Sequence, residues 1–458
     1  MVNKNSIKEL KHQARRASIK EGIFASAKGA FGDSYLSPFA IAINASSSAV
    51  AFLSSISGLL GPLTQLFSSR LMEKYSRKKI VLRAVFLESL MWLPLIAIAI
   101  LFYKGIAVSF LPFLLLIFFA FYIIISNIDD PAWFSWMGDI VDKKFRGRWF
   151  SKRNLLTGFV SIILALAASF FLNFFKTKNW TMLGFAILFF LALIFRMMSW
   201  NVFRKKYEPK IKLKKGYYFS FWNFLMKAPK TNFGKFTIFH GFFSFACAIA
   251  SPLFTVYLLR NLEFSYITYM LVALSSSVFS IAVMEIWGKF ADKYGNYRVM
   301  GITSLLIPTI PLLWIISPSP IYLILVPGII SGVSWAGFNL ATGNFIYDNV
   351  TTEKRGLAVS YFNMTNGIGI FLGAGLGALM IKFLTISFIE PILLIFIIGG
   401  IARMIVVFFW ITKIKEIRKT EKIDGKKALK NLIFKQAKPT LVEEVHEIMS
   451  LKKYLFGK

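Results

Sequence analysis

Residues 288–298 read Gly-Lys-Phe-Ala-Asp-Lys-Tyr-Gly-Asn-Tyr-Arg and separate two long apolar runs. The stretch is typical of a tight turn at the inner face of a membrane. Gly288 would allow two helices to approach closely, and Gly295 would adopt a backbone conformation that other residues resist. Asp292 can pair with a neighbouring base or lie at a helix N-terminus. We therefore expect a membrane-spanning helix on each side of this connector.

The same organisation occurs earlier in the chain, which indicates an internal repeat. Residues 69–79 read Ser-Arg-Leu-Met-Glu-Lys-Tyr-Ser-Arg-Lys-Lys, and Lys74 precedes Lys293 by 219 positions, each followed by Tyr. Other segments recur at similar offsets: Asp139, Arg146 and Asn154 precede Asp348, Arg355 and Asn363 by 209 positions, Ser37-Pro38 precedes Ser251-Pro252 by 214, and Arg196 precedes Arg403 by 207. The chain therefore reads as two copies of one unit.

The composition is that of a membrane protein. Hydrophobic residues make up 56% of the 458 positions, and 49 of them are Phe. A spanning helix needs about 20 apolar residues. Twelve segments qualify: 22–44, 47–69, 80–102, 108–139, 148–173, 180–203, 234–259, 265–288, 298–317, 321–347, 356–382 and 388–411.

The net charge of +32 is distributed unevenly along these segments. With the N-terminus inside, most of the 54 Lys and Arg residues fall in inner connections and few in outer ones. This is the positive-inside pattern of the cytoplasmic membrane, where the inner leaflet is anionic. We therefore expect a multi-pass plasma-membrane protein with both termini in the cytoplasm, and no nucleic-acid partner.

The connector at 288–298 resembles the loop between the second and third helices of major facilitator superfamily transporters. In the first copy Ser69 and Ser76 replace the two glycines, and Glu73 replaces the Asp. The hairpin from Trp133 to Asn154 is also similar to that superfamily. The resemblance covers about residues 20–412. It implies an all-α membrane protein with 12 transmembrane helices in two pseudo-symmetric six-helix bundles.

The expected domain organisation follows from the repeat. It comprises a basic cytoplasmic N-terminus (1–21), a first bundle (22–203), a linker with an interfacial helix (204–233), a second bundle (234–412) and a basic tail (413–458). Aromatic residues among lysines favour the interfacial helix, although a simple tether would explain the linker as well.

The resemblance also implies a cytoplasmic gate at the inner connections, where charge pairs break and re-form between inward-facing and outward-facing states. Its residues are Glu73, Lys74, Arg77, Asp139, Arg146, Glu285, Gly288, Asp292, Lys293, Arg298, Asp348 and Arg355. We expect Arg196 and Arg403 to have a structural role instead, with their long side chains extending to the inner interface.

Four acids lie within apolar segments and indicate a cavity, because an ionisable group in a membrane is costly unless it is paired or faces water. They are Asp33, Glu88, Asp129 and Asp130. Asp129 shares a helical face with Trp133 and Trp136 at i+4 and i+7, while Asp130 shares one with Phe134. Carboxylates beside aromatic rings suit a cationic or hydroxyl-rich ligand. Alternatively, one Asp pairs with Lys28 or with an Arg on a helix, and the indoles only pack.

The second half lacks these acids. At the offsets above, Asp33 corresponds to Cys247, Asp129 to Phe338 and Asp130 to Asn339. We therefore expect the first half to handle a proton or other cation, and the second half to contact substrate. The candidate substrate contacts are His240, Trp335, Phe338 and Asn339.

These features predict a secondary active transporter that moves a small solute by alternating access, coupled to protons. The alternatives are a non-transporting sensor or partner protein on the same scaffold and, among transporters, an exporter of amphiphilic compounds. Three His and one Cys give no metal-ligand spacing, and the sequence has no ATP-binding loop of the GxxxxGK[ST] type. We expect no enzymatic activity, no cofactor, no metal site and a monomeric state.

Overall fold

The computed structural model describes residues 4–418 and 420, apart from 73, 143–145, 210–219, 352–353 and 386–388. Regular structure in this part of the chain is entirely helical. The chain divides into two compact units. The first comprises residues 1–218, 248–270 and 366–387, and the second comprises residues 219–247, 271–365 and 388–458.

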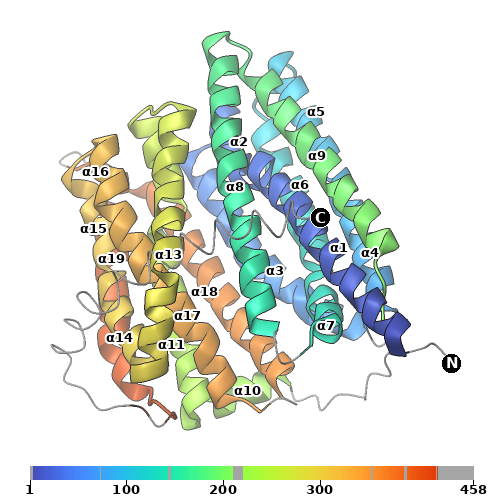
Figure 1. Ribbon diagram of the computed structural model, residues 1–458. Coiled ribbons are helices and arrows are strands. Elements are labelled where there is room, and N and C mark those ends of the chain that lie inside the picture. The colour runs from blue at the N-terminus through green and yellow to red at the C-terminus, as the bar shows by residue number, and fades with distance from the viewer. Residues whose placement is uncertain are drawn as a thin grey trace. The chain divides into compact units, whose positions relative to one another are not determined.

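The helices that lie wholly in the first unit are shown in Figure 1. They are α1 (Lys4–Phe31), the 3₁₀ turn η1 (Asp33–Tyr35), α2 (Leu36–Ala42), α3 (Ser47–Leu71), α4 (Arg77–Leu90), α5 (Trp92–Tyr103), α6 (Leu111–Asn127), α7 (Asp130–Ile140), α8 (Arg146–Thr177), α9 (Thr181–Lys205), α12 (Leu253–Val256) and the π-helix η4 (Tyr257–Asn261).

The helices of the second unit, with three that cross the boundary, complete the chain. They are α10 (Phe221–Lys227), the 3₁₀ turn η3 (Ala228–Lys230), α11 (Asn232–Ala250), α13 (Tyr266–Tyr294), α14 (Asn296–Leu306), α15 (Thr309–Ile316), α16 (Pro320–Leu325), α17 (Pro327–Asn349), α18 (Arg355–Phe383), α19 (Pro391–Trp410) and the 3₁₀ turn η5 (Ile411–Lys413). The crossing helices are α11, α13 and α18.

Among the described residues, eleven candidate spans are long and apolar enough to cross a membrane. They agree with the expected spans except the first, 22–44, which the structure divides into α1, η1 and α2. The break lies at Gly32, where a Cβ would be 2.2 Å from the Trp92 indole. Only glycine leaves room for that ring at the break, and Asp33 begins the next turn.

A second helix break determines where Asp129 and Asp130 lie. The span 111–140 is divided into α6, which ends at Asn127, and α7, which begins at Asp130. Pro131 lacks a backbone N–H and occupies the first turn of α7, where that group would have no helical partner. Asp129 and Asp130 therefore lie at the N-terminal end of a helix in the middle of a span.

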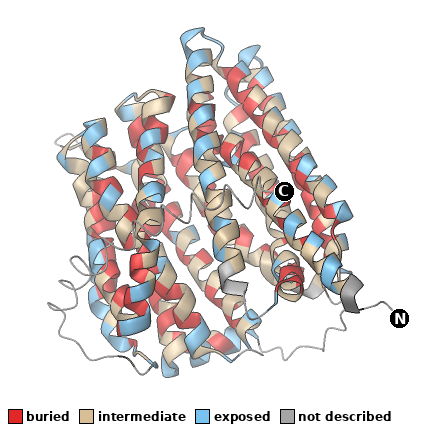
Figure 2. Ribbon diagram, viewed as in Figure 1, coloured by how far each residue is buried: buried red, intermediate tan, exposed pale blue. Residues whose placement is uncertain are grey.

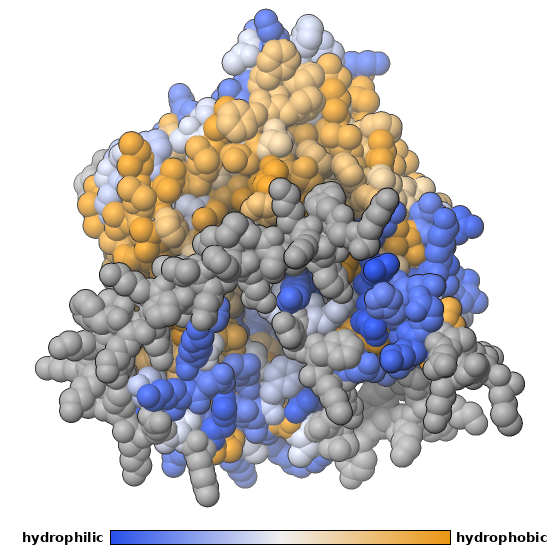
Figure 3. All heavy atoms as spheres, in the orientation of Figure 1, coloured by the Kyte–Doolittle hydropathy of each residue, from blue (hydrophilic) through white to orange (hydrophobic). Residues whose placement is uncertain are grey.

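Each unit has its own apolar core. In the first unit a cluster around Trp136, Met137 and Phe203 packs α4, α7 and α9 together. In the second unit a larger cluster centres on Phe236, Phe290 and Phe345. Figure 2 shows buried residues along the packed faces of these helices. Hydrophobic side chains cover a broad area of the face in Figure 3, as expected for helices that contact lipid.

Helices α3 and α18 pack closely within the first unit. A Cβ on Gly367 of α18 would lie 2.3 Å from the Gly58 carbonyl oxygen of α3. Gly295 has a φ of 93°, as its position in the connector predicted. By contrast, a Cβ on Gly288 would have no described heavy atom within 4 Å, so the close approach expected there is not observed.

Candidate functional site

A cavity of about 550 Å³ lies within the first unit. Its lining comes from α1, η1, α2, α3, α4, α6, α7, α8 and α9. The sequence-predicted residues Asp33, Glu88, Asp129, Asp130 and Trp133 all line it, whereas Trp136 does not. Trp136 is fully buried in the core, and its indole N–H donates to the Tyr207 carbonyl oxygen at 2.9 Å.

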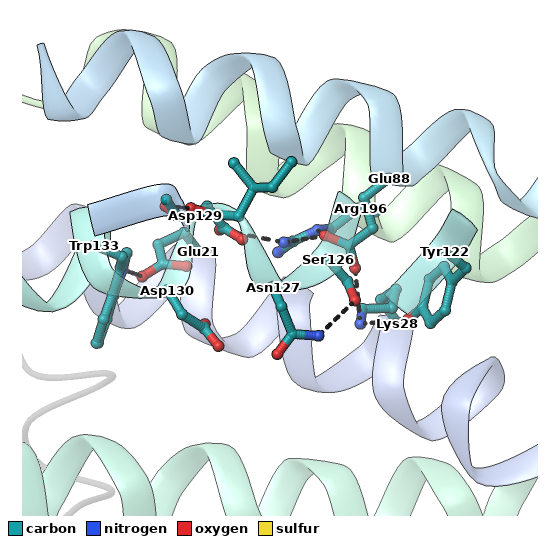
Figure 4. Close-up of polar contacts among 12 residues, drawn as sticks. Glu21, Lys28, Glu88, Tyr122, Ser126, Asn127, Asp129, Asp130, Trp133 and Arg196 are labelled. Atoms are coloured by element: carbon teal, nitrogen blue, oxygen red, sulfur yellow. Dashed lines mark hydrogen bonds and ion pairs between the residues drawn. The ribbon is translucent and has the colours of Figure 1, made fainter. Parts of the chain in front are cut away.

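Glu88 is at the centre of a buried ion-pair cluster (Figure 4). Glu88 is 1% exposed to solvent. Oε1 lies 3.0 Å from Lys28 Nζ, and Oε2 accepts a hydrogen bond from Arg196 Nε at 2.6 Å and also contacts Nη2. A lone carboxylate at this depth would lose several kcal/mol of hydration free energy, and its two cationic partners offset that loss.

Lys28 connects Glu88 to the rest of the cluster. Its ammonium group lies 2.8 Å from Asp33 Oδ2 and 3.1 Å from the Tyr122 hydroxyl, which itself donates to Asp33 Oδ1. With Glu88, these contacts use all three N–H donors of Lys28. The Asp33 side chain is 41% exposed, so it connects the buried cluster to the accessible part of the cavity.

Asp129 and Asp130 are less well compensated than Glu88. Asp129 is 6% exposed, its Oδ2 is 3.6 Å from Arg196 Nη2, and its Oδ1 has no hydrogen-bond partner among the described residues. Asp130 Oδ2 accepts from the Gln65 amide at 3.0 Å, and no described cation pairs with it. A buried carboxylate oxygen without a donor is unfavourable, so these two groups mark where the cavity can accept a positive charge.

Glu21, which lies near Asp129 and Trp133 in Figure 4, is almost fully buried and accepts from three donors. Its Oε1 accepts from Trp133 Nε1, Arg153 Nη2 and Ser18 Oγ, each at 3.1 Å. The Arg153 guanidinium also lies 4.7 Å from the Trp133 ring centroid, which is a cation–π contact. These contacts fix the Trp133 indole in the cavity wall.

Lys206, just beyond the end of α9, is buried without a hydrogen-bond partner among the described residues. Its ammonium nitrogen lies 4.8 Å from the Trp136 ring centroid and 5.2 Å from that of Phe203. Burial lowers the pKa of Lys206 to about 8, against the opposing effect of the Glu21 carboxylate. The aromatic faces supply part of the stabilisation that water would give the ammonium group.

The cavity has a surplus of acids. Five carboxylates line it but only three cationic side chains: Glu21, Asp33, Glu88, Asp129 and Asp130 against Lys28, Arg153 and Arg196. Charges at this depth are not screened by bulk water. Among the described residues, no group of three or more His, Cys, Asp or Glu is placed to hold a metal ion.

The second unit holds the predicted substrate contacts in a different setting. His240 is 4% exposed and its Nε2 lies 3.0 Å from Thr342 Oγ1, while the Phe236 and Phe338 rings pack against it. Phe338 is itself part of the apolar core and Trp335 packs on that core, whereas Asn339 is exposed. The structure thus brings His240, Trp335 and Phe338 into one aromatic cluster.

Arg403 in the second unit corresponds to Arg196 but has no carboxylate partner among the described residues. It is 2% exposed and donates to the Cys247 carbonyl oxygen at 3.0 Å and to the Ile307 carbonyl oxygen at 3.5 Å. The expectation that Arg196 and Arg403 extend to the inner interface is therefore wrong. Arg196 lies nine residues from the end of α9, about 14 Å along the helix, which is farther than its side chain reaches.

One group of predicted gate residues meets in the first unit. Arg77 is 5% exposed and forms an ion pair with Asp139, and its Nε lies 3.7 Å from Glu208 Oε1. It also donates to the carbonyl oxygens of Ser135 at 3.0 Å and Pro209 at 3.2 Å. Lys74 follows the end of α3. Glu73 and the side chain of Arg146 lie outside the described residues.

The gate residues predicted in the second unit have separate partners. Glu285 pairs with Lys289 at 2.9 Å on the surface of α13, and exposed Asp292 lies 3.9 Å from Arg418. Asp348 accepts from Asn296 Nδ2 at 2.8 Å, whereas Arg355 donates to the carbonyl oxygens of Tyr347 and Val350. Lys293 lies at the end of α13 and Arg298 near the start of α14.

Several cavity residues were not predicted as site residues. Arg196 was assigned a structural role, Lys28 was considered only as an alternative partner, and Glu21, Tyr122 and Arg153 were not considered. Glu21 precedes Lys28 by seven residues and so shares a helix face with it, whereas Arg153 and Arg196 lie on helices that contain no acid, so nothing in their own helices marked them as partners.

A family model described as Major Facilitator Superfamily matches residues 23–284 and 237–445. Among solved structures, a variant of the nucleoside transporter NupG is similar at 16% identity with a TM-score of 0.65, covering 89% of this chain and all of that one. A bacterial homologue of the iron transporter ferroportin in an inward-facing state is similar at 16% identity with a TM-score of 0.63, covering 88% of this chain and 99% of that one. No curated protein sequence matches this chain.

Proposed function

The chain belongs to the major facilitator superfamily, and we propose that it is a secondary active transporter that moves a small solute by alternating access, coupled to protons. Accumulation of a solute against its gradient needs an energy source, and the sequence has no ATP-binding loop of the GxxxxGK[ST] type. We propose that it lies in the cytoplasmic membrane with both termini inside. In this orientation most of its Lys and Arg residues fall in cytoplasmic connections, as the positive-inside rule requires.

The observation that carries the proposal is the surplus of carboxylates in the cavity of the first unit. Five acids face three bases, so two negative charges remain if every group is ionised. A low-dielectric cavity favours neutralisation of that surplus by bound protons or another cation. Of these acids, Asp129 and Asp130 have the fewest cationic and hydrogen-bonding partners, and we propose that they bind the proton.

Arg196 provides a physical link between protonation and conformation. Its guanidinium contacts Glu88 from α4 and Asp129 from the α6–α7 break. When Asp129 takes up a proton, this second attraction is lost and Arg196 is held by Glu88 alone. We infer that protonation thereby loosens the contact between α9 and the α6–α7 break, and that this change favours one state of the transport cycle.

The test is transport by the full chain in liposomes. A thermal-stability screen against sugars, amino acids and organic ions first identifies a ligand, because a ligand that binds only the folded protein raises its melting temperature. Accumulation of the labelled ligand is then measured with and without an imposed pH gradient. We expect the gradient to drive accumulation.

The variants separate coupling from folding. The double variant Asp129→Asn, Asp130→Asn should lose gradient-driven accumulation while still folding, which its melting temperature shows. Asp142→Asn is the matched control, since Asp142 is an exposed acid that does not line the cavity. Accumulation that is equal with and without the gradient would show that protons are not the coupling ion.

A further inference from the structure

The cationic side chains deep in the cavity are already engaged. Lys28 directs its three donors to Asp33, Glu88 and Tyr122. Arg196 contacts two carboxylates, those of Glu88 and Asp129. An anionic ligand would have to break these pairs and would add to a surplus of negative charge, so the cluster disfavours anions.

The free acceptor capacity lies at the start of α7. Asp129 Oδ1 is buried with no hydrogen-bond donor in the described part of the chain. Asp130 accepts only from the neutral amide of Gln65 among the described residues. Both residues line the cavity, and Figure 4 shows their carboxylates on neighbouring positions beside Asn127. A ligand that enters here meets acceptors, which bind a donor or a positive charge.

Aromatic surface adjoins these carboxylates one helical turn away. Trp133 follows Asp129 by four residues and Phe134 follows Asp130 by four, and both rings line the same cavity. Trp133 already binds the Arg153 guanidinium through its ring face. Phe134 is 63% exposed, so its ring retains area for a ligand. A carboxylate next to a free aromatic face is the environment that favours an organic cation.

Building on the transport function proposed above, we propose that the solute is an organic cation with an apolar body. Its charge docks at Asp129 and Asp130 when they are unprotonated, so the proton and the solute occupy these carboxylates in turn, and its apolar part packs against Phe134. A neutral hydroxylated solute would gain no charge attraction from these carboxylates, and an anion would be repelled by them. The sequence pattern left cationic and hydroxyl-rich ligands open, and the unequal compensation of the carboxylates favours the cation.

The test compares three probes of similar size and shape. Benzyltrimethylammonium is the cation, neopentylbenzene is its neutral isostere, and phenylmethanesulfonate is an anion. A quaternary ammonium carries no titratable proton, so its binding does not report protonation of the ligand. Binding to the purified full chain is measured by calorimetry at fixed pH. We expect only benzyltrimethylammonium to bind.

Variants then locate the site. Asp130→Asn should weaken binding of the cation about tenfold or more, because it removes a poorly hydrated charge partner. Phe134→Leu keeps apolar volume but removes the ring face, and should weaken binding by about threefold. Asp142→Asn should leave affinity unchanged. The proposal is overturned if the neutral probe binds as tightly as the cation, if Asp130→Asn binds as well as the parent, or if no probe binds.

This inference and the transport proposal can fail separately. A cation that binds at Asp130 but is not carried across liposome membranes would leave the binding site standing and refute transport. Proton-driven accumulation of a neutral solute, with no binding of benzyltrimethylammonium, would leave transport standing and refute the cationic substrate. Calorimetry measures binding and the liposome assay measures transport, so neither result determines the other.

Discussion

Arg196 and Arg403 occupy corresponding positions in the two halves of the chain, and both are buried. Arg196 contacts the carboxylate of Glu88, whereas Arg403 donates to the backbone carbonyl oxygens of Ile307 and Cys247. Ile307 follows Lys293 by 14 residues, as Glu88 follows Lys74. Each half therefore has one buried arginine at this position. The arginine of the first half contacts side-chain carboxylates, and that of the second half contacts backbone carbonyl oxygens.

The difference determines which of the two arginine contacts a proton could change. Backbone carbonyl oxygens keep their partial charge at any accessible pH, so the Arg403 contacts are fixed. A carboxylate can be neutralised by a proton, which changes the force on its partner. We infer that the repeat supplied a common arginine and that deep acids made the first half responsive to a bound proton or cation.

The largest effect is expected when Glu88 is changed. Glu88→Gln leaves Lys28 without its buried partner and Arg196 with only the more distant Asp129. Removing one member of a buried ion cluster costs about 3–5 kcal/mol of unfolding free energy. Chemical unfolding in detergent measures this loss. The control is Glu285→Gln, because Glu285 forms only a partly exposed pair with Lys289 and should change stability by less than about 1 kcal/mol.

A matched pair of arginine substitutions tests the comparison directly. Arg196→Met leaves Glu88 with one cation and removes the neighbour of Asp129, so we expect a loss of about 3 kcal/mol. Arg403→Met removes hydrogen bonds to two carbonyl oxygens but also removes a buried charge that lacks a described carboxylate, so we expect about 1 kcal/mol. Equal losses in the two variants would mean that the carboxylates contribute nothing specific to Arg196.

The sequence predicted the fold well because its signals are local. The length of each span depends only on one run of apolar residues, while the repeat offsets and the family resemblance supplied the arrangement of the spans. The sequence also identified the deep acids, since an unpaired carboxylate is unfavourable wherever it lies in an apolar run. Asp33, Glu88, Asp129 and Asp130 all line the cavity of the first unit.

The partners of these acids could not be predicted in the same way. Lys28, Tyr122 and Arg196 lie on three helices, and their meeting depends on how those helices rotate and pack. Arg196 was assigned to the interface because a long cationic side chain can reach water from near a helix end. The roles of the gate residues and of the aromatic cluster around His240 stay predictions, because they depend on the change between transport states and on a bound ligand.

Lys206 is a buried cation of the first half that, unlike Arg196, has no carboxylate within ion-pair distance in the described residues. Burial lowers its folded-state pKa to about 8, below the ordinary value of 10.5. The unfolded chain therefore binds more protons between these pH values, and stability should rise from pH 8 toward 10.5 by at most about 3 kcal/mol.

The matching variant is Lys206→Met, which removes the titrating group but keeps apolar volume. Below pH 8 it should be more stable than the parent, because the cost of burying the ammonium is gone, and the difference should shrink as the pH rises. Unfolding curves for both proteins at a series of pH values give this difference directly. A difference that does not depend on pH would contradict the lowered pKa of Lys206.

The smallest effect is expected at Asp33, although it belongs to the same cluster as Glu88. Its side chain is 41% exposed, and in Asp33→Asn the Lys28 ammonium still has Glu88 and Tyr122. Water can replace the lost contact, so the loss of unfolding free energy should stay below about 1 kcal/mol. A loss as large as that of Glu88→Gln would mean that Asp33 is shielded from water, and that the cluster is closed on the side where we expect the cavity to admit solute.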